Sequence, residues 1–294
     1  MKKRDRLFQI TANTVLILLT LSCILPFMLL IISSFTDEYA LLRDGYSFFP
    51  KKLSFAAYQY LLLDSDVIFR GYIISVGVTV IGTLINVFLT TLFAYPLSRK
   101  DLPGRRFFSF FIYVTMLFNG GLVPTYIMWT QTFKIRNTWF AYIVPGLMMS
   151  TFFIIMMRTY FTTNIPDTVI EAARIDGAKE FRILFKVVFP MAVPIMATVT
   201  LLVGIRYWND WMNGLYYIND SKKFSIQALL QRILMDVRFL QQTQGAGNLN
   251  IDLVVPSTAI RMAIATMGVL PVLVLYSFLQ KYFVKGITVG AIKG

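Results

Sequence analysis

The sequence contains no histidine and a single cysteine, Cys23, and only 15% of its 294 residues are charged. Without histidine there is no imidazole for acid–base chemistry, for a Ser-His-Asp triad or for a metal site. One cysteine excludes an intrachain disulfide and a cluster of thiolate ligands. Glycine is never followed by lysine, so the Gly-x-x-x-x-Gly-Lys-Ser/Thr phosphate loop is absent and any ATP has to be bound by another chain. We therefore expect a protein that is not an enzyme and binds no cofactor or metal itself.

Long apolar runs dominate what is present, because 56% of the residues are hydrophobic and the mean hydropathy is +0.64. A helix needs about 20 apolar residues to cross the bilayer core. Six stretches are long enough. The sequence thus predicts an all-α polytopic membrane protein with six transmembrane helices in a single domain over 1–294. The predicted spans cover about 13–35, 71–98, 107–130, 137–157, 187–205 and 262–280.

The basic residues indicate how these spans are oriented. If the N-terminus is cytoplasmic, the inner segments carry 16 lysines and arginines in 63 residues, and the outer segments carry 12 in 97 residues. The positive-inside rule describes this bias, and it places both termini in the cytoplasm. We therefore attribute the net charge of +13 to membrane topology rather than to nucleic-acid binding.

The spans contain no acidic residue, whereas carriers coupled to protons or sodium commonly place ionisable groups near the membrane midplane. This argues against a secondary carrier. Uncharged polar side chains do occur in the spans, namely Asn86, Thr90, Thr91, Asn119 and Thr125. They either form hydrogen bonds between helices or line a route for a hydrophilic solute.

The cytoplasmic segment 158–186 predicts two short helices joined by a turn. Pro166 suits a first helical turn, and Thr168 and Glu171 have the spacing of a capping box. Gly177 ends the first helix, because glycine tolerates the left-handed conformation found at helix ends. The segment predicts a compact helix–turn–helix on the cytoplasmic side.

Two interpretations of this helix–turn–helix remain open from the residues alone. The small Ala172 and Ala173 allow close approach of a partner backbone, so the loop is suited to a groove of another protein. Alternatively, its second helix, which begins near Ala178, lies on the lipid surface. In either case Pro190 and Pro194 bend or reset the chain at the start of the fifth span.

The same segment resembles the EAA loop of the membrane subunits of ATP-binding-cassette importers. The family pattern is Glu-Ala-Ala, three residues, Gly, nine residues, Ile, one residue and Leu-Pro. This chain keeps the spacing, with Val187 in place of Ile and Phe189 in place of Leu. The matching residues are Glu171-Ala172-Ala173, Asp176-Gly177-Ala178, Val187 and Phe189-Pro190.

The resemblance continues over nearly the whole chain. Arg158, Phe161, Ile165 and Pro166, together with Trp208-Asn209-Asp210-Trp211, are similar to the carbohydrate, maltose-type branch. The segments 118–126, 280–286 and 290–294 are similar to a Gram-positive subgroup associated with oligosaccharides and polysaccharides. The resemblance implies the six-span type I importer permease fold in a bacterial plasma membrane, in contact with lipid. It also implies four partners: a second permease subunit, two ATPase subunits that bind ATP and Mg²⁺, and an extracellular solute-binding lipoprotein.

The resemblance further implies roles for individual residues of the cytoplasmic loop. The coupling residues are Glu171, Ala172, Ala173, Asp176, Gly177, Ala178 and Arg182. In the family the glutamate pairs with a basic residue of the ATPase, a role that falls here to Glu171. Gly177 is the turn that lets the two short helices fold together.

On the outer side, the resemblance implies that the loop 206–261 faces the binding protein. Candidate contacts with the binding protein or substrate are Trp208, Asn209, Asp210, Trp211, Asn119 and Tyr126. The two tryptophans either stack on sugar rings or belong to an interfacial aromatic belt. Asn209 and Asp210 either fix the loop or bind sugar.

We thus predict the permease subunit of an ATP-driven, binding-protein-dependent importer of oligosaccharides or polysaccharides. The first alternative is the same architecture importing a non-sugar solute, such as a peptide or polyol. The second is a stand-alone channel or secondary carrier that is active without ATPase partners.

Overall fold

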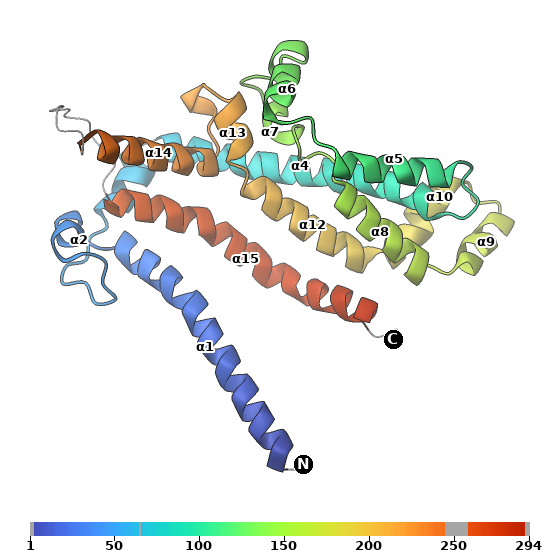
Figure 1. The fold of residues 1–294 in the computed structure, drawn as a ribbon, viewed down its shortest axis with the longest axis horizontal. Helices are drawn as coiled ribbons and strands as arrows, with labels where there is room; N and C mark the ends of the chain where they lie inside the picture. The colour runs from blue at the N-terminus through green and yellow to red at the C-terminus, as the bar shows by residue number, and fades with distance from the viewer. Residues whose placement is uncertain (1–2, 65, 245–257, 292–294) are drawn as a thin grey trace. The chain divides into compact units, whose positions relative to one another are not determined.

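Figure 1 shows the computed structural model of the chain, which describes residues 3–64, 66–244 and 258–291. The described part is helical, with one isolated antiparallel bridge between Thr36 and Leu53. The chain divides into two compact units. Unit 1 comprises Met1–Phe69 and Leu230–Leu270, and unit 2 comprises Arg70–Leu229 and Pro271–Gly294.

Unit 1 begins with the long helix α1 (Lys3–Ser34), whose apolar side chains are exposed along most of its length. The short helices α2 (Glu38–Asp44) and α3 (Ala56–Gln59) follow. The Glu38 carboxylate accepts the backbone N–H groups of Thr258 and Ala259, both at 2.8 Å. These are the first residues of α15 (Thr258–Ala291), so Glu38 satisfies donors that the helix itself leaves free and complements its dipole.

Unit 2 holds most of the remaining helices. They are α4 (Asp66–Ser98), α5 (Arg105–Leu117), α6 (Leu122–Ile127), α7 (Phe140–Ile143), α8 (Thr151–Asn164), α9 (Asp167–Ile175), α10 (Glu180–Ile183), α11 (Phe189–Met191), α12 (Val193–Trp208) and α13 (Met212–Tyr217). Helices α14 (Ile226–Gln244) and α15 run through both units. The first four residues of α4 belong to unit 1. Residues 245–257 of the expected extracellular loop and 292–294 of the C-terminal motif lie outside the described residues.

Three of the predicted spans coincide with continuous helices. The first and second spans fall in α1 and α4, which are long and apolar enough to cross a membrane, and the sixth falls in α15. The third and fifth spans each correspond to a pair of helices bent by 107° and 83°. By length and composition the described residues give two spans, or four if each bent pair is one span. A polytopic membrane protein is therefore supported, while the number of six spans stays a prediction.

Each interruption has a local cause. In the third span, Asn119 accepts the N–H of Gly121 at 2.9 Å, and Gly121 adopts a positive φ of 83°, so the helix stops before α6. The fifth span bends at Ala192, between the two prolines that were expected to bend it. The fourth predicted span is split between α7 and α8, with Gly146 at a φ of 70° in the gap. Helix α8 then continues past the predicted end of that span, into the segment expected to be cytoplasmic.

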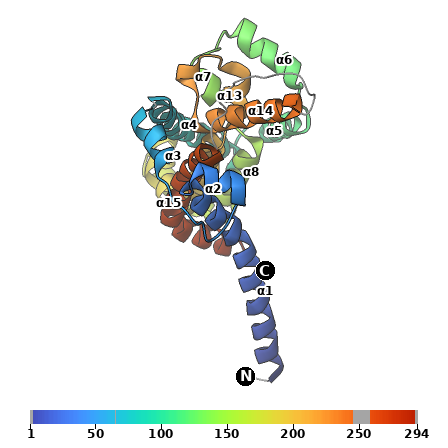
Figure 2. The ribbon, with the colours of Figure 1, turned by 90° about the vertical axis from the view of Figure 1, so that its left-hand side faces the viewer.

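The core of unit 2 lies between α4, α8 and α12, which run side by side in Figure 1. Two glycines of α4 make room for rings: a Cβ at Gly77 would lie 2.6 Å from the Trp139 ring, and one at Gly82 would lie 2.6 Å from the Tyr207 ring. Figures 1 and 2 both place α7 beside α13, and the N–H of Asn137 donates to the Tyr217 carbonyl at 3.1 Å. The core thus fixes both the end of α4 and the start of the α9–α10 loop.

Candidate functional site

The predicted helix–turn–helix is present as α9 and α10. Helix α9 begins at Asp167 with Pro166 at its N-cap position, and no side chain caps it. The expected capping box is therefore wrong, because Thr168 already lies inside the helix. The acidic Asp167 in the first turn complements the helix dipole instead.

The turn between the two helices depends on Gly177. Its φ of 75° lies in the left-handed region, which is costly for any residue with a Cβ atom. The N–H of Gly177 donates to the Arg174 carbonyl at 2.9 Å, and the N–H of Ala178 donates to the Ala173 carbonyl at 3.0 Å. These bonds close the end of α9, as the sequence predicts, and α10 starts three residues after the glycine.

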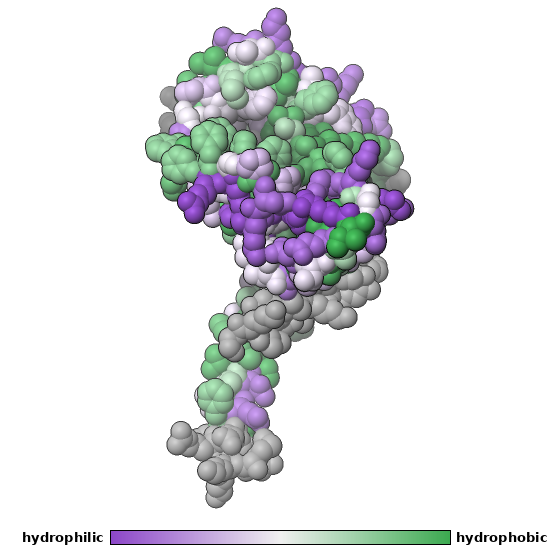
Figure 3. All heavy atoms as spheres, turned by 90° about the vertical axis from the view of Figure 1, so that its right-hand side faces the viewer, coloured by the Kyte–Doolittle hydropathy of each residue, from purple (hydrophilic) through white to green (hydrophobic). Residues whose placement is uncertain are grey.

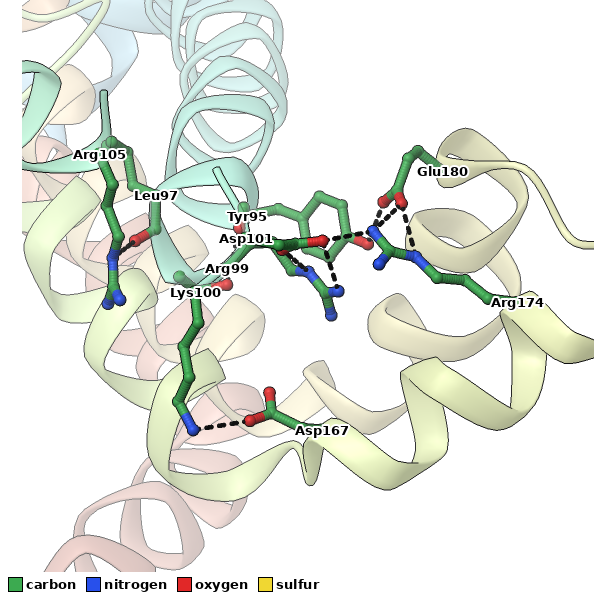
Figure 4. A network of polar contacts seen from close by, with 10 residues as sticks. Tyr95, Leu97, Arg99, Lys100, Asp101, Arg105, Asp167, Arg174 and Glu180 are labelled. Atoms are coloured by element: carbon green, nitrogen blue, oxygen red, sulfur yellow. Dashed lines mark hydrogen bonds and ion pairs between the residues drawn. The ribbon is translucent and has the colours of Figure 1, made fainter. Parts of the chain in front are cut away.

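A network of charged side chains ties this loop to the end of α4 (Figure 4). Arg174 of α9 bonds both Glu180 of α10 and Asp101, which follows α4; its contact with Asp101 is 2.8 Å long. Asp101 also accepts Arg99 Nε at 3.1 Å. Tyr95 of α4 donates its hydroxyl to Glu180 at 2.8 Å.

A separate ion pair joins the same two segments, because Lys100 Nζ lies 2.8 Å from an Asp167 oxygen. The loop is therefore held at both ends of α9. The sequence did not predict this network, since its partners lie far apart along the chain.

The network keeps its carboxylates ionised. The hydrogen bonds from Arg99 and Arg174 lower the pKa of Asp101 to about 2. Burial alone would raise the pKa of Glu180, but its hydrogen bonds with Arg174 and Tyr95 outweigh this and lower it. Because the side chains of Asp101, Arg174 and Glu180 remain 41–51% exposed, each pair contributes little to stability, about 0–1 kcal/mol. The network's main effect is to fix the orientation of α9 and α10 relative to α4.

Most of the coupling residues expected from the sequence are exposed. Glu171, Ala172, Asp176, Gly177 and Arg182 are exposed, while Ala173 and Ala178 are half-buried against the core. Within the part of the chain that the structure describes, Glu171 has no ion-pair partner.

The exposed loop is not uniformly polar. Ile175 and Phe181 are 87% and 72% exposed. Figure 3 shows the end of unit 2 that carries α9 and α10, where hydrophilic side chains form a band with apolar side chains beside it. The loop thus combines a fixed backbone with an outward face of mixed polarity.

The predicted outer residues separate into two groups. Trp208 is only 3% exposed and its ring lies 6.2 Å from that of Tyr72, so it offers no free face in this structure. Trp211 is half-buried and Asn209 is exposed. In the second group, Asn119 forms the turn before α6, and Tyr126 stacks on Tyr217 of α13 with centroids 5.9 Å apart.

Asp210 is the one outer candidate with unusual electrostatics. One carboxylate oxygen accepts the N–H of Asn213 at 3.2 Å, whereas Oδ2 is buried and has no partner among the described residues. Burial raises the pKa of Asp210 to about 6, although the hydrogen bonds and Arg206 act in the opposite direction. Asp210 therefore fixes the start of α13. Within the described residues, no group of three or more acidic or cysteine side chains could hold a metal ion.

We expect Asp210→Asn to stabilise the protein at pH 7.5, by up to about 3 kcal/mol. The folded state holds the proton up to about pH 6 and the unfolded state only to about pH 4, so wild-type stability falls as pH rises through this window. Asparagine keeps the acceptor for Asn213 without a buried charge. The measurement is the melting temperature in detergent at pH 5 and pH 7.5, with the exposed Asp236→Asn as control. An unchanged or lower melting temperature at pH 7.5 would contradict the assignment.

Comparison with known proteins places this geometry in a family. Residues 80–289 match the family described as the binding-protein-dependent transport system inner membrane component. The chain is 36% identical, over 99% of its length and 100% of the relative's, to the polygalacturonan/rhamnogalacturonan transport system permease protein YtcP of Bacillus subtilis. It is 26% identical, over 95% and 94% of the two chains, to the trehalose/maltose transport system permease protein MalG of Thermococcus litoralis.

A solved structure is similar over nearly the whole chain. It is a crystal structure of a bacterial ABC transporter involved in the import of the acidic polysaccharide alginate, with a TM-score of 0.82 and 30% identity over 96% of this chain and 99% of that one. The expected permease fold is thereby confirmed, and the chain belongs to the family of inner membrane components of binding-protein-dependent transport systems.

Proposed function

We propose that the chain is the permease subunit of an ATP-driven importer of oligosaccharides or polysaccharides. The observation that carries the ATP-driven part is the α9–α10 loop: Glu171 is exposed there and has no ion-pair partner among the described residues, while Arg174, one turn further along α9, ties the helix to Asp101. The similar proteins support the cargo class, because they are named for the transport of pectic polysaccharides, trehalose/maltose and alginate. The alternative of a non-sugar solute has no support from these relatives.

The partners follow from the same proposal. A second permease completes the membrane part, two ATPase subunits bind ATP and Mg²⁺, and an extracellular lipoprotein delivers the solute. Both termini lie in the cytoplasm, and the plasma membrane holds the complex. As the inner membrane component, this chain does not itself hydrolyse ATP.

Coupling begins where the loop docks on the ATPase. Glu171 pairs with a basic residue of that subunit, and the small Ala172 lets the two backbones come close. Because α9 and α10 are tied to the end of α4 by Asp101 and Glu180, movement of the loop is passed to a membrane helix. ATP shifts the conformation only as far as its differential affinity for the two states allows.

The outer residues take supporting roles in this proposal. Trp211 and the exposed Asn209 face the binding protein, whereas Asp210 fixes the loop between α12 and α13. Asn119 and Tyr126 contribute to the solute route. Asn119 forms the turn before α6, and Tyr126 stacks on Tyr217.

A mild-detergent pull-down of the tagged protein from its native membrane tests the proposed complex. We expect recovery of a second permease, an ATPase and a binding protein, together with vanadate-sensitive ATP hydrolysis. Uptake competition then tests the cargo: oligosaccharides should compete with the natural solute, and peptides and polyols should not. Recovery of the chain alone, with transport that is insensitive to vanadate, would favour the stand-alone carrier instead.

We expect Glu171→Ala to lower transport by at least about tenfold, because a charged contact at a protein interface is lost. Gly177→Arg should also prevent assembly, since arginine is strained at a φ of 75° and protrudes from the docking turn. Transport in liposomes and co-purification of the ATPase measure both effects. Asp236→Ala, which removes an exposed carboxylate of α14, is the control. Wild-type transport and assembly in both variants would rule out the coupling role.

The anchoring network gives a different expectation. Arg174→Gln should leave assembly intact and change stability by less than about 2 kcal/mol, because it removes two exposed ion pairs. The amount of solute moved per ATP hydrolysed should fall by about twofold to thirtyfold, the range for a residue that carries coupling. Arg43→Gln breaks a comparably exposed ion pair with Asp44 in unit 1 and should leave the ratio unchanged. An equal ratio in the two variants would show that the network does not transmit movement.

A further inference from the structure

The gap between α7 and α8 interrupts a stretch that is apolar enough to span the membrane. Residues 144–150 lie between α7 and α8 and are not helical; at its two ends the Val144 N–H still donates to the Phe140 carbonyl at 2.9 Å and the Ser150 carbonyl accepts the N–H of Ile154 at 3.1 Å. Lipid cannot accept or donate hydrogen bonds, so non-helical backbone at membrane depth requires partners from the protein. An unsatisfied carbonyl there is strongly unfavourable. The question is therefore which groups take the carbonyls that this gap leaves free.

Four side chains from other elements donate hydrogen bonds to these carbonyls. Tyr207 Oη donates to the carbonyl of Ile143 at 2.9 Å, and Asn213 Nδ2 donates to that of Pro145 at 3.0 Å. The next two carbonyls are taken in the same way. Arg206 Nη2 donates to Gly146 at 3.3 Å, and Asn86 Nδ2 donates to Leu147. The donors come from α4, α12 and α13, whereas all four acceptors lie within five residues.

Three of these donors are buried and are themselves held in place. Asn86 is 0% exposed, and its Oδ1 accepts the Thr90 hydroxyl at 3.1 Å, which leaves its NH₂ group to face the gap. Tyr207 reaches Ile143 because Gly82 has no Cβ atom in the space that its ring occupies. Asn213 is tied through its backbone N–H to Asp210.

The break itself has a local cause, because Pro145 has no N–H to donate and Gly146 adopts a positive φ of 70°. The donors from other elements add to this by bonding the carbonyls that the break leaves free. The three buried donors bond the carbonyls of alternate residues, Ile143, Pro145 and Leu147. One of these donors, Asn86, belongs to α4, the helix whose Tyr95 bonds Glu180 of the α9–α10 loop, so a displacement of that loop can reach the gap through α4.

We propose that Asn86, Tyr207 and Asn213 are positioning residues that hold 144–150 in one non-helical conformation, and that this conformation sets how tightly ATP hydrolysis is coupled to solute passage. The coupling half of the inference rests on the proposed function. The structural half does not, because it concerns only the hydrogen bonds of the gap.

The test uses two tyrosines of matched chemistry. Tyr207→Phe removes one hydroxyl that donates to the carbonyl of Ile143. Tyr142→Phe is the control, because Tyr142 is also buried and both hydrogen bonds of its hydroxyl lie outside the gap: it donates to the Lys223 carbonyl at 3.0 Å and accepts the N–H of Ser225 at 3.0 Å. Asn213→Leu is a second variant, which removes the donor to Pro145 without changing the side-chain size much.

Two readouts in the complete complex separate positioning from mere stability. Hydrogen exchange of the peptide covering 143–151 should become about fivefold faster in Tyr207→Phe and in Asn213→Leu, and remain at the wild-type rate in Tyr142→Phe. In liposomes, both gap variants should hydrolyse more ATP without binding protein and move several times less solute per ATP. The control should keep the wild-type ratio.

Equal exchange in the gap variants and the control would overturn the proposal, and so would faster exchange with an unchanged transport ratio. If the wild-type complex shows no ATP-driven transport, the proposed function fails, and with it the coupling half of the inference. In that case the exchange measurement still decides whether Tyr207 and Asn213 hold the gap.

Discussion

A lipid bilayer offers no partner for a backbone N–H or C=O group, and this constraint organises unit 2. Where the chain runs as a continuous helix, as in α4, the constraint is met locally. Where it does not, the polar groups have to be met from elsewhere. The gap after α7 is the second case. There the amide of Asn86 and the hydroxyl of Tyr207 donate to backbone carbonyls that would accept backbone N–H groups in a continuous helix.

Helix α4 joins the two ends of this arrangement. Near its middle, Asn86 bonds the gap between α7 and α8; nine residues later, Tyr95 bonds Glu180 of the α9–α10 loop. Nine residues of α-helix span about 14 Å, and a helix is stiff over that length. The α9–α10 loop and the interrupted fourth span are thus both attached to α4. A shift of the loop cannot leave α4 unmoved while Asp101 and Arg174 stay paired, so both networks respond to the same displacement.

The sequence predicted well those features that depend on local composition. Continuous apolar runs identified α1, α4 and α15, and Gly177 marked the turn because only its left-handed conformation closes α9. Pro190 and Pro194 correctly indicated a bend in the fifth span. The break in the fourth span was missed although Gly146 was visible, because hydropathy measures the side chains and not the hydrogen bonding of the backbone.

Features that depend on distant residues were beyond the sequence. Asp101 and Arg174 lie more than seventy positions apart, and the local sequence around neither residue predicts the ion pair. Trp208 illustrates the same limit, since its burial beside Tyr72 follows from the packing of α4 against α12 and not from its motif. The capping box failed for a smaller reason: Pro166 occupies the N-cap position and α9 begins at Asp167, so Thr168 lies two positions too late to cap it.

In the proposed function the α9–α10 loop has to be both attached to its own chain and accessible to a partner, and its charges divide accordingly. A helix that docks on a moving partner transmits force only if it is itself attached to the rest of the chain, and the ion pairs of Arg174 and Asp167 provide that attachment on α9. The residue left for the partner then has to be unpaired, because an internal ion pair would have to be broken before docking. Glu171 meets this condition among the described residues. Its freedom is therefore a consequence of the network that holds its neighbours, and the two features have to be altered separately to distinguish docking from transmission.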